Sequence, residues 1–344
     1  PAAVQRLRAA ARRFFVWAAL AGAATIAEAR LVELTVLNTT DLHGAICHSP
    51  SVYAERNEGS LLQCATLVRR EREQAPNLLL LDCGDIIQGT AASFQTRGGI
   101  MATAMNAMGY DAYVPGNHEF DWGIDALAGF MDRMQAPALA ANLVAGPEAP
   151  AAFRRVRPYV VKEIDGLRVA IVGLTTPNIP NWTRGTAEAG LDFPDSRRAL
   201  EQILPEVRRE KPHVMILLVH QGYLRKDDAA NQLNAIGRRF GEFDLMLGGH
   251  LHAVSTRTQV GKLTYGQAGA GAEGVLRVRL TFDTVKNAVT DKQLEFLPVE
   301  PELPEDPDIH AQVADDQARA DEWLGTVIVR TKSDLVASLA MPGL

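Results

Sequence analysis

The sequence predicts an α/β domain built of layers, because short apolar runs alternate with amphipathic segments of helical length. Residues 77–82 (NLLLLD) form a continuous apolar run, which is typical of a buried strand. Residues 60–73 place Leu61, Leu62, Ala65 and Val68 on one helical face. The expected strands are Leu31–Leu37, Asn77–Asp82, Ala112–Val114, Ala138–Ala141, Val169–Leu174, Val214–Val219 and Leu245–Leu247. The expected helices include Ser60–Glu73, Ile124–Met134, Ser196–Arg209 and Ala229–Phe240.

The pattern changes beyond residue 252. Residues 254–299 predict β-hairpins, since short β-rich runs are joined there by turns that contain Gly or Asn. A stretch rich in Pro and acidic residues (PVEPELPEDPD) overlaps the end of this region and indicates a linker. Residues 309–324 predict a helix, and the last twenty residues resemble the beginning of a further unit.

The first thirty residues have the layout of a secretory signal peptide. Four arginines precede an apolar run over 14–26, and the small-x-small sequence Ala27-Glu28-Ala29 follows it. The run is too short for a comfortable membrane span, so no stable span is expected once the segment is removed. An amphipathic helix is the alternative. The signal interpretation predicts an exported protein, periplasmic or extracellular.

The composition of the chain indicates which kinds of binding partner to expect. The chain has 344 residues and a formal net charge of −6, which does not favour a nucleic acid polymer. The three cysteines match no zinc pattern. In an exported protein Cys47 and Cys64 are the one pair to consider for a disulfide, whereas Cys83 borders a strand and is expected to be a small buried residue. Oligomeric state has no signature in the sequence.

Five short motifs carry residues with metal-binding chemistry, and each begins where an apolar run stops. They are Asp41 and His43 in NTTDLHG, Asp85 in LDCGDIIQG, Asn117 and His118 in GNHEFD, His220 at the end of HVMILLVH, and His250 and His252 in LGGHLH. The loops beyond strand C-termini form the ligand crevice of an α/β sheet, so the five segments are expected to converge.

Carboxylate, imidazole and amide ligands without thiolates suit zinc, manganese, iron or cobalt. Seven of these eight residues already exceed the needs of one tetrahedral ion and suit two divalent metal ions roughly 3.5–4 Å apart. The one-residue spacings Asp41/His43 and His250/His252 predict that both side chains lie on one side of an extended segment.

Each motif has a plainer explanation when it is taken alone. Asp85 could be a helix N-cap, and Asp121 could cap the helix expected from Gly123. A lone histidine at a strand end is more often a hydrogen-bonded loop residue. The joint pattern outweighs these explanations, because five of the eight histidines fall inside the motifs. The other three are expected to be structural or surface residues: His48, His213 and His310.

The ordered set D-x-H, GD, GNHE, H and GHxH resembles the calcineurin-like metallophosphoesterases. The strings TTDLHG, GDIIQGT, GNHEFDWG and GGHLH are similar to the exported branch that contains 5′-nucleotidases and 2′,3′-cyclic-nucleotide 2′-phosphodiesterases. The resemblance implies a four-layer α/β/β/α sandwich with its metal site at the C-terminal ends of the strands. It also implies a catalytic domain over residues 31–300, preceded by the signal-like residues 1–30. Residues 301–344 would then be a linker helix and the start of a C-terminal nucleotide-binding domain.

The resemblance also implies a role for each motif residue. One metal would be held by Asp41, His43 and His252, the other would be held by Asn117, His220 and His250, and Asp85 would bridge the two. His118 would face the phosphate, oriented by Asp121, and Asn117 would help to stabilise the phosphoryl oxygens.

The implied reaction is hydrolysis of a phosphate ester, with a nucleoside 5′-monophosphate as the favoured substrate. The 2′,3′-cyclic-nucleotide 2′-phosphodiesterase/3′-nucleotidase reaction is the alternative. Hydrolysis of sulfur esters, known from a more distant relative, ranks lower. So does a non-catalytic surface protein that only binds metal or phosphate, because no expected ligand is missing from the sequence.

Overall fold

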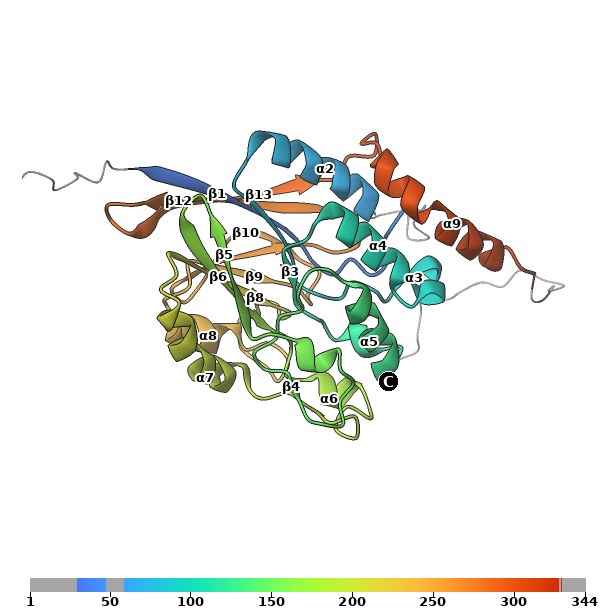
Figure 1. The fold of residues 1–344 in the computed structure, drawn as a ribbon, viewed down its shortest axis with the longest axis horizontal. Helices are drawn as coiled ribbons and strands as arrows, with labels where there is room; N and C mark the ends of the chain where they lie inside the picture. The colour runs from blue at the N-terminus through green and yellow to red at the C-terminus, as the bar shows by residue number, and fades with distance from the viewer. Residues whose placement is uncertain (1–29, 48–58, 328, 330–344) are drawn as a thin grey trace, which may run out of the picture.

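Two β-sheets face each other at the centre of the molecule (Figure 1). The computed structural model describes residues 30–47, 59–327 and 329, so the signal-like segment and nearly all of the last twenty residues lie outside it. The first sheet has the order β13-β12-β1-β2-β3 and the second has the order β10-β11-β9-β8-β6-β5. A small sheet pairs β4 (Val144–Ala145) with β7 (Leu191–Asp192).

The first sheet combines the strands β1 (Leu31–Thr39), β2 (Leu78–Asp82), β3 (Ala112–Tyr113), β12 (Gly274–Asp283) and β13 (Ala288–Pro298). Within it β1, β2 and β3 run parallel, and the hairpin β12–β13 pairs antiparallel with β1. The second sheet is built from β5 (Tyr159–Ile164), β6 (Leu167–Leu174), β8 (Val214–Val219), β9 (Leu245–Gly248), β10 (Val254–Val260) and β11 (Leu263–Ala268). Here β6, β8, β9 and β11 are parallel neighbours, so several strands of both sheets send their C-terminal ends to one side.

Helices cover the outer face of each sheet. On the first sheet lie α2 (Leu61–Gln74), α3 (Ala91–Thr96), α4 (Gly99–Met108) and α5 (Ile124–Arg133); on the second lie α7 (Ser196–Arg209) and α8 (Leu233–Arg239). The four-residue helix α6 (Ile179–Trp182) follows β6, and α9 (Pro307–Leu324) packs along α3 and α4. Two 3-10 turns complete the elements, η1 (His118–Phe120) and η2 (Phe153–Arg155). None of the helices in the described residues is both long enough and apolar enough to cross a membrane.

Three apolar clusters separate these four layers. One lies between the two sheets and includes Val36, Leu81 and Leu218, which are fully buried. The second joins the first sheet to its helices, and the third joins the second sheet to α7 and α8. Burial of these side chains on both faces of the central strands explains their continuous apolar runs. The predicted four-layer α/β/β/α sandwich is therefore confirmed.

Most predicted elements are present with small changes at their ends. The strand expected at 138–141 is wrong, because Ala138 and Leu139 form only isolated bridges, with Tyr113 and Arg157. The helix expected from 229 begins only at Leu233. The hairpins expected over 254–299 exist as β10–β11 and β12–β13, but the two hairpins belong to different sheets.

Candidate metal centre

The five motifs meet where the loops leave the strands. Asp41 follows β1, Asp85 follows β2, Asn117 follows β3, His220 follows β8, and His250 follows β9. Backbone hydrogen bonds tie these loops together: the N–H of Asp41 donates to the carbonyl of Gly84, and the N–H of His43 donates to the carbonyl of Asp85. The parallel strands thus bring residues that are about two hundred positions apart into one place.

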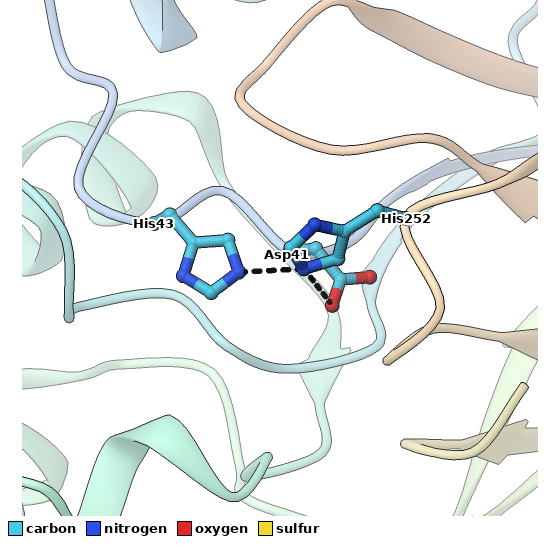
Figure 2. A group of neighbouring side chains, drawn as sticks. All are labelled: Asp41, His43 and His252. Atoms are coloured by element: carbon cyan, nitrogen blue, oxygen red, sulfur yellow. Dashed lines mark hydrogen bonds and ion pairs between the residues drawn. The ribbon is translucent and has the colours of Figure 1, made fainter. Parts of the chain in front are cut away.

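Asp41, His43 and His252 form the group that we call the outer triad. Their ligand atoms all lie within 4.8 Å of one another. The Nε2 atoms of His43 and His252 are 2.9 Å apart, and Nε2 of His252 is 3.6 Å from Oδ1 of Asp41 (Figure 2). Asp41 is fully buried, whereas the side chain of His252 is 40% exposed, so this triad opens to solvent on one side.

Asp85, His220 and His250 form the inner triad, which has the same compactness. Nε2 of His220 lies 3.1 Å from Oδ2 of Asp85 and 3.1 Å from Oδ1 of Asn117. Asp85, His220 and Asn117 are all buried. The structure therefore brings Asn117 to the inner triad.

The chemistry of these donor atoms fits divalent cations. Nδ1 of His220 lies 2.7 Å from the carbonyl oxygen of Cys83, which can only accept, so Nδ1 carries a proton and Nε2 turns to the oxygens of Asp85 and Asn117. Oδ2 of Asp85 is buried, and the polar group that the described residues place beside it is Nε2 of His220, itself a metal-ligand atom. Neither Asp41 nor Asp85 pairs with a lysine or arginine in the described part of the chain. Buried carboxylates normally pair with a charge or coordinate a metal.

The pKa values point to the same deficit of positive charge. Burial raises the pKa of Asp41 to about 7. Burial opposes a charged His220, but the nearby Asp85 outweighs it and raises the pKa of His220 to about 10. The same pairing, acting against burial, lowers the pKa of Asp85. Without a metal ion, the proton on His220 thus supplies the positive charge that a bound cation would supply beside Asp85. Burial and the charge of His220 lower the pKa of His250 to about 4, which keeps its imidazole neutral and available as a ligand.

The backbone at the triads adopts a conformation that side chains rarely occupy. Five of the six triad residues have a positive φ, namely Asp41 (51°), His43 (49°), Asp85 (57°), His250 (73°) and His252 (52°). The predicted extended geometry of the one-residue spacings is therefore wrong, and His250 and His252 fall in different triads. Non-glycine residues in the left-handed region cost energy and cluster at functional sites.

A pair of side chains that belongs to neither triad, His118 and Asp121, lies next to the outer triad. Nδ1 of His118 is 2.7 Å from Oδ2 of Asp121, and its ring centroid is 5.4 Å from that of His43. Partial burial opposes a charged His118, but the bond to Asp121 and the charge of Asp85 prevail and raise its pKa. Helix α5 begins at Ile124 with Gly123 as its N-cap residue and has no side-chain cap, so the capping alternative for Asp121 is wrong.

A known family matches the part of the chain that carries this geometry. The family described as calcineurin-like phosphoesterase matches residues 34–254, which is more than half of the chain. The chain belongs to the calcineurin-like phosphoesterase family. Its match spans the strands that carry all five motifs, from β1 to the loop after β9.

Among its curated relatives, the Bos taurus 5′-nucleotidase is 30% identical over 332 residues, which are 88% of this chain and 56% of that protein. The 2′,3′-cyclic-nucleotide 2′-phosphodiesterase/3′-nucleotidase of Yersinia enterocolitica is 28% identical over 66% of this chain and 38% of that protein. The trifunctional nucleotide phosphoesterase YfkN of Bacillus subtilis is 29% identical over 65% of this chain and 17% of that protein. The chain thus spans only about a sixth to just over half of these relatives.

Solved structures share the fold. The 5′-nucleotidase precursor of Thermus thermophilus superposes with a TM-score of 0.75 at 26% identity, covering 89% of this chain and 62% of that one. The YfkN phosphoesterase from Bacillus subtilis gives a TM-score of 0.76 at 22% identity, covering 86% of this chain and all of that one. The latter identity supports a common fold alone.

Two glycines let the loops pack closely at the inner triad. A Cβ at Gly116 would lie 2.2 Å from Oδ1 of Asp85, and a Cβ at Gly84 would lie 2.8 Å from Nδ1 of His220. Gly84 also has a φ of +94°. Any larger residue would push a triad side chain aside, which explains why both motifs carry glycine at these positions.

Sequence reasoning missed the part played by Glu119. Its carboxylate is fully buried and accepts the backbone N–H groups of Asp85, Ile86, Ile87 and Gly116. It therefore fixes the Asp85 loop to the loop that carries Asn117. Its place between His118 and Asp121 in the motif was the available signal, but nothing in the sequence indicates a charged side chain that binds only backbone.

The other residues singled out in the sequence lie elsewhere or stay apart. His213 accepts the N–H of Arg168, and His310 pairs with Glu305, while His48 is outside the described residues. All three cysteines are free, so the Cys47–Cys64 disulfide is absent, and Cys64 instead lies against backbone carbonyls of residues 272 and 274. Cys83 is buried, as predicted. The helix N-cap after the Asp85 loop is Thr90, not Asp85.

Proposed function

We propose that the chain hydrolyses phosphate monoesters of nucleosides with two divalent metal ions, as a 5′-nucleotidase-like enzyme. The observation that carries the proposal is the pair of triads, in which buried carboxylate and imidazole acceptors converge without a lysine or arginine in the described residues. Similarity to the Bos taurus 5′-nucleotidase over 88% of this chain supports the nucleotide as the substrate class.

In this proposal the outer triad holds one ion, and His220, His250 and Asn117 hold the other. Asp85 would serve both, which would account for a buried carboxylate that has no lysine or arginine partner among the described residues. Two such ions supply Lewis acidity, which lowers the pKa of water and offsets charge on phosphoryl oxygens. Zinc, manganese, iron and cobalt all suit this donor set.

His118 and Asp121 act on the substrate and not on the ions. Asp121 accepts a hydrogen bond from Nδ1–H of His118, so Nε2 is the ring nitrogen left for the substrate. With its raised pKa, His118 can hold a proton at Nε2 and donate it to the leaving oxygen or to a phosphoryl oxygen. The amide of Asn117 adds a further donor for a phosphoryl oxygen.

The second candidate reaction is opening of a 2′,3′-cyclic nucleotide. It is favoured by the match to the Yersinia enterocolitica protein with that activity in its name. The sulfate thiohydrolase SoxB of Thermus thermophilus shares the fold at 21% identity and adds no argument for sulfur-ester hydrolysis by this chain.

Domain division and location belong to the same proposal. Residues 31–300 would form the catalytic unit, with 301–344 as a linker helix and the start of a nucleotide-binding unit. Helix α9 and its packing on α3 and α4 support a structured connection. The chain would be exported after removal of residues 1–30, which N-terminal sequencing of the protein recovered from the periplasm or medium would test.

Assays on the chain stripped of metal and resupplied with manganese, zinc or cobalt test the function. AMP, 2′,3′-cyclic AMP and a generic aryl phosphate separate the candidates. Metal-dependent release of phosphate from AMP is the expected result. Faster opening of the cyclic ester would favour the second candidate. Two bound ions without turnover of any of the three esters would support a protein that only binds.

A further inference from the structure

An exposed tryptophan lies directly against a residue of the inner triad. The indole of Trp182 and the imidazole of His250 have ring centroids 5.5 Å apart and planes inclined by 34°. Trp182 is 48% exposed, although an indole is among the most apolar large side chains. The ring therefore lies against His250 of the candidate metal centre, while about half of the side chain is in solvent.

The other exposed aromatic side chains in the described residues contact aromatic rings outside the triads, and Tyr223 does so with Tyr265 at 6.4 Å. Phe94 packs on Trp122 at 5.6 Å and on Trp323 at 6.4 Å, so these rings partner one another. Trp182 makes its ring contact with His250 alone among the described residues. Packing within the protein thus accounts for the Phe94 cluster, whereas no second aromatic ring of the described residues covers Trp182.

The segment that carries Trp182 is held in place. Ile179 is fully buried at the start of α6, and the N–H of Thr183 donates to its carbonyl. Before it, Thr176 donates through its hydroxyl to the carbonyl of Ala230 and accepts the N–H of Asn178. A large ring on a fixed backbone can bind a flat ligand with little loss of conformational entropy.

The residues that follow the triad histidines add apolar surface nearby. Leu251 follows His250 and is 36% exposed, and it packs so closely over Gly222 that a Cβ there would lie 2.2 Å from its Cγ. Gly222 itself lies two residues after His220. The inner triad is therefore bordered by apolar side chains, whereas the ring of His118, which is paired with Asp121, lies beside His43 of the outer triad.

We propose that Trp182 is a stacking surface for the aromatic part of the substrate, a nucleobase or an aryl group, while the phosphate is held at the triads. The inference rests on the proposed function and sharpens it, because it assigns selectivity for aromatic esters to a residue of this chain. Base–aromatic stacking is lost when the aromatic residue becomes alanine, and the loss is about 5- to 100-fold in affinity.

The test compares W182A and W182F with W323F, a matched control at a tryptophan of similar exposure that packs on Phe94. AMP is the aromatic substrate and glycerol 2-phosphate is the aliphatic one. W182A should raise KM for AMP by about tenfold and leave kcat and the kinetics on glycerol 2-phosphate within about twofold. W182F should restore most of the affinity, and W323F should behave like the parent.

A second readout does not need turnover. AMP should quench tryptophan emission in the parent and in W323F, and the quench should vanish in W182F. If the parent hydrolyses neither ester but keeps the quench, the proposed function is wrong and the stacking surface stands. If the parent hydrolyses both and W182A slows both equally, or loses metal, Trp182 only orients His250 and the inference is overturned. Unchanged AMP kinetics in W182A overturn it as well.

Discussion

The two triads contain the same kinds of ligand but sit in different surroundings. In the inner triad Asp85 and His220 are buried, whereas the outer triad pairs a buried Asp41 with a half-buried His43 and an exposed His252. Their support differs as well: Glu119 binds four backbone N–H groups around Asp85, whereas Nδ1 of His43 rests on the carbonyl and side chain of Gln88. A rigid inner half and an accessible outer half are expected to differ in how tightly they hold an ion.

Replacing Asp85 should have the largest effect, because Asp85 is assigned to both ions. We expect D85N to lose the cation pair and to lower kcat by about 10³-fold or more. Metal analysis with phosphate-release assays checks this. D82N is the matched control, since Asp82 is equally buried but binds Thr39 and the N–H of Gly84. Retention of two ions by D85N would contradict the bridging assignment.

Replacing His118 should separate catalysis from metal binding. His118 belongs to neither triad, so H118A should keep both ions and lose about 10²-fold in turnover. D121N should lose less, because the imidazole remains. Metal content and kcat are measured on the same preparations. A fall in metal content in H118A would show that our division of the site is wrong.

Replacing Glu119 and Gln88, which support the inner and outer triads, should show which triad binds its ion more tightly. E119Q takes a charge from four backbone donors, so we expect inner-ion affinity to fall by about 10- to 100-fold. Q88A removes only one of two acceptors of His43, since the backbone carbonyl stays, and should weaken the outer ion by a smaller factor. Metal titration by calorimetry measures both. Equal losses in the two variants would remove the contrast between the triads.

The metal-free protein offers a smaller, pH-dependent effect. The pKa of His220 is raised in the folded state to about 10, so its contribution to stability is present below pH 6.5 and is lost as pH rises through 10. His220 should therefore lower the free energy of unfolding as pH rises from 7 to 9, by at most about 1.4 kcal/mol per pH unit, in addition to the loss that the raised pKa of Asp41 causes up to about pH 7. The pKa of His252 is lowered, so this residue adds nothing in that window.

Denaturant unfolding at several pH values measures this slope. H220Q should reduce it, and H252Q should leave it unchanged. If H252Q reduces the slope and H220Q does not, His252 and not His220 binds the proton that stabilises the folded state, which would contradict this prediction.

The layers and strand ends could be predicted because strands of a sheet that is covered on both faces consist of continuous apolar runs. The strand expected at 138–141 failed because tertiary contacts gave Ala138 and Leu139 only single bridges. The assignment of the ligands to two metal ions came from the resemblance of the motifs to the calcineurin-like metallophosphoesterases. Their positive φ values could not be predicted, because they depend on how the Asp41 and Asp85 loops bond to each other. Nothing in the sequence indicated Trp182, because its proposed role depends on a contact with His250, a residue far away along the chain.

The central claim is that two ions in these triads are required together for hydrolysis of a phosphate ester. The most direct test titrates manganese into the stripped chain while metal binding and phosphate release from AMP are followed together. We predict two binding steps, with activity appearing only as the second site fills. Full activity at one equivalent, or turnover without any metal, would contradict the claim.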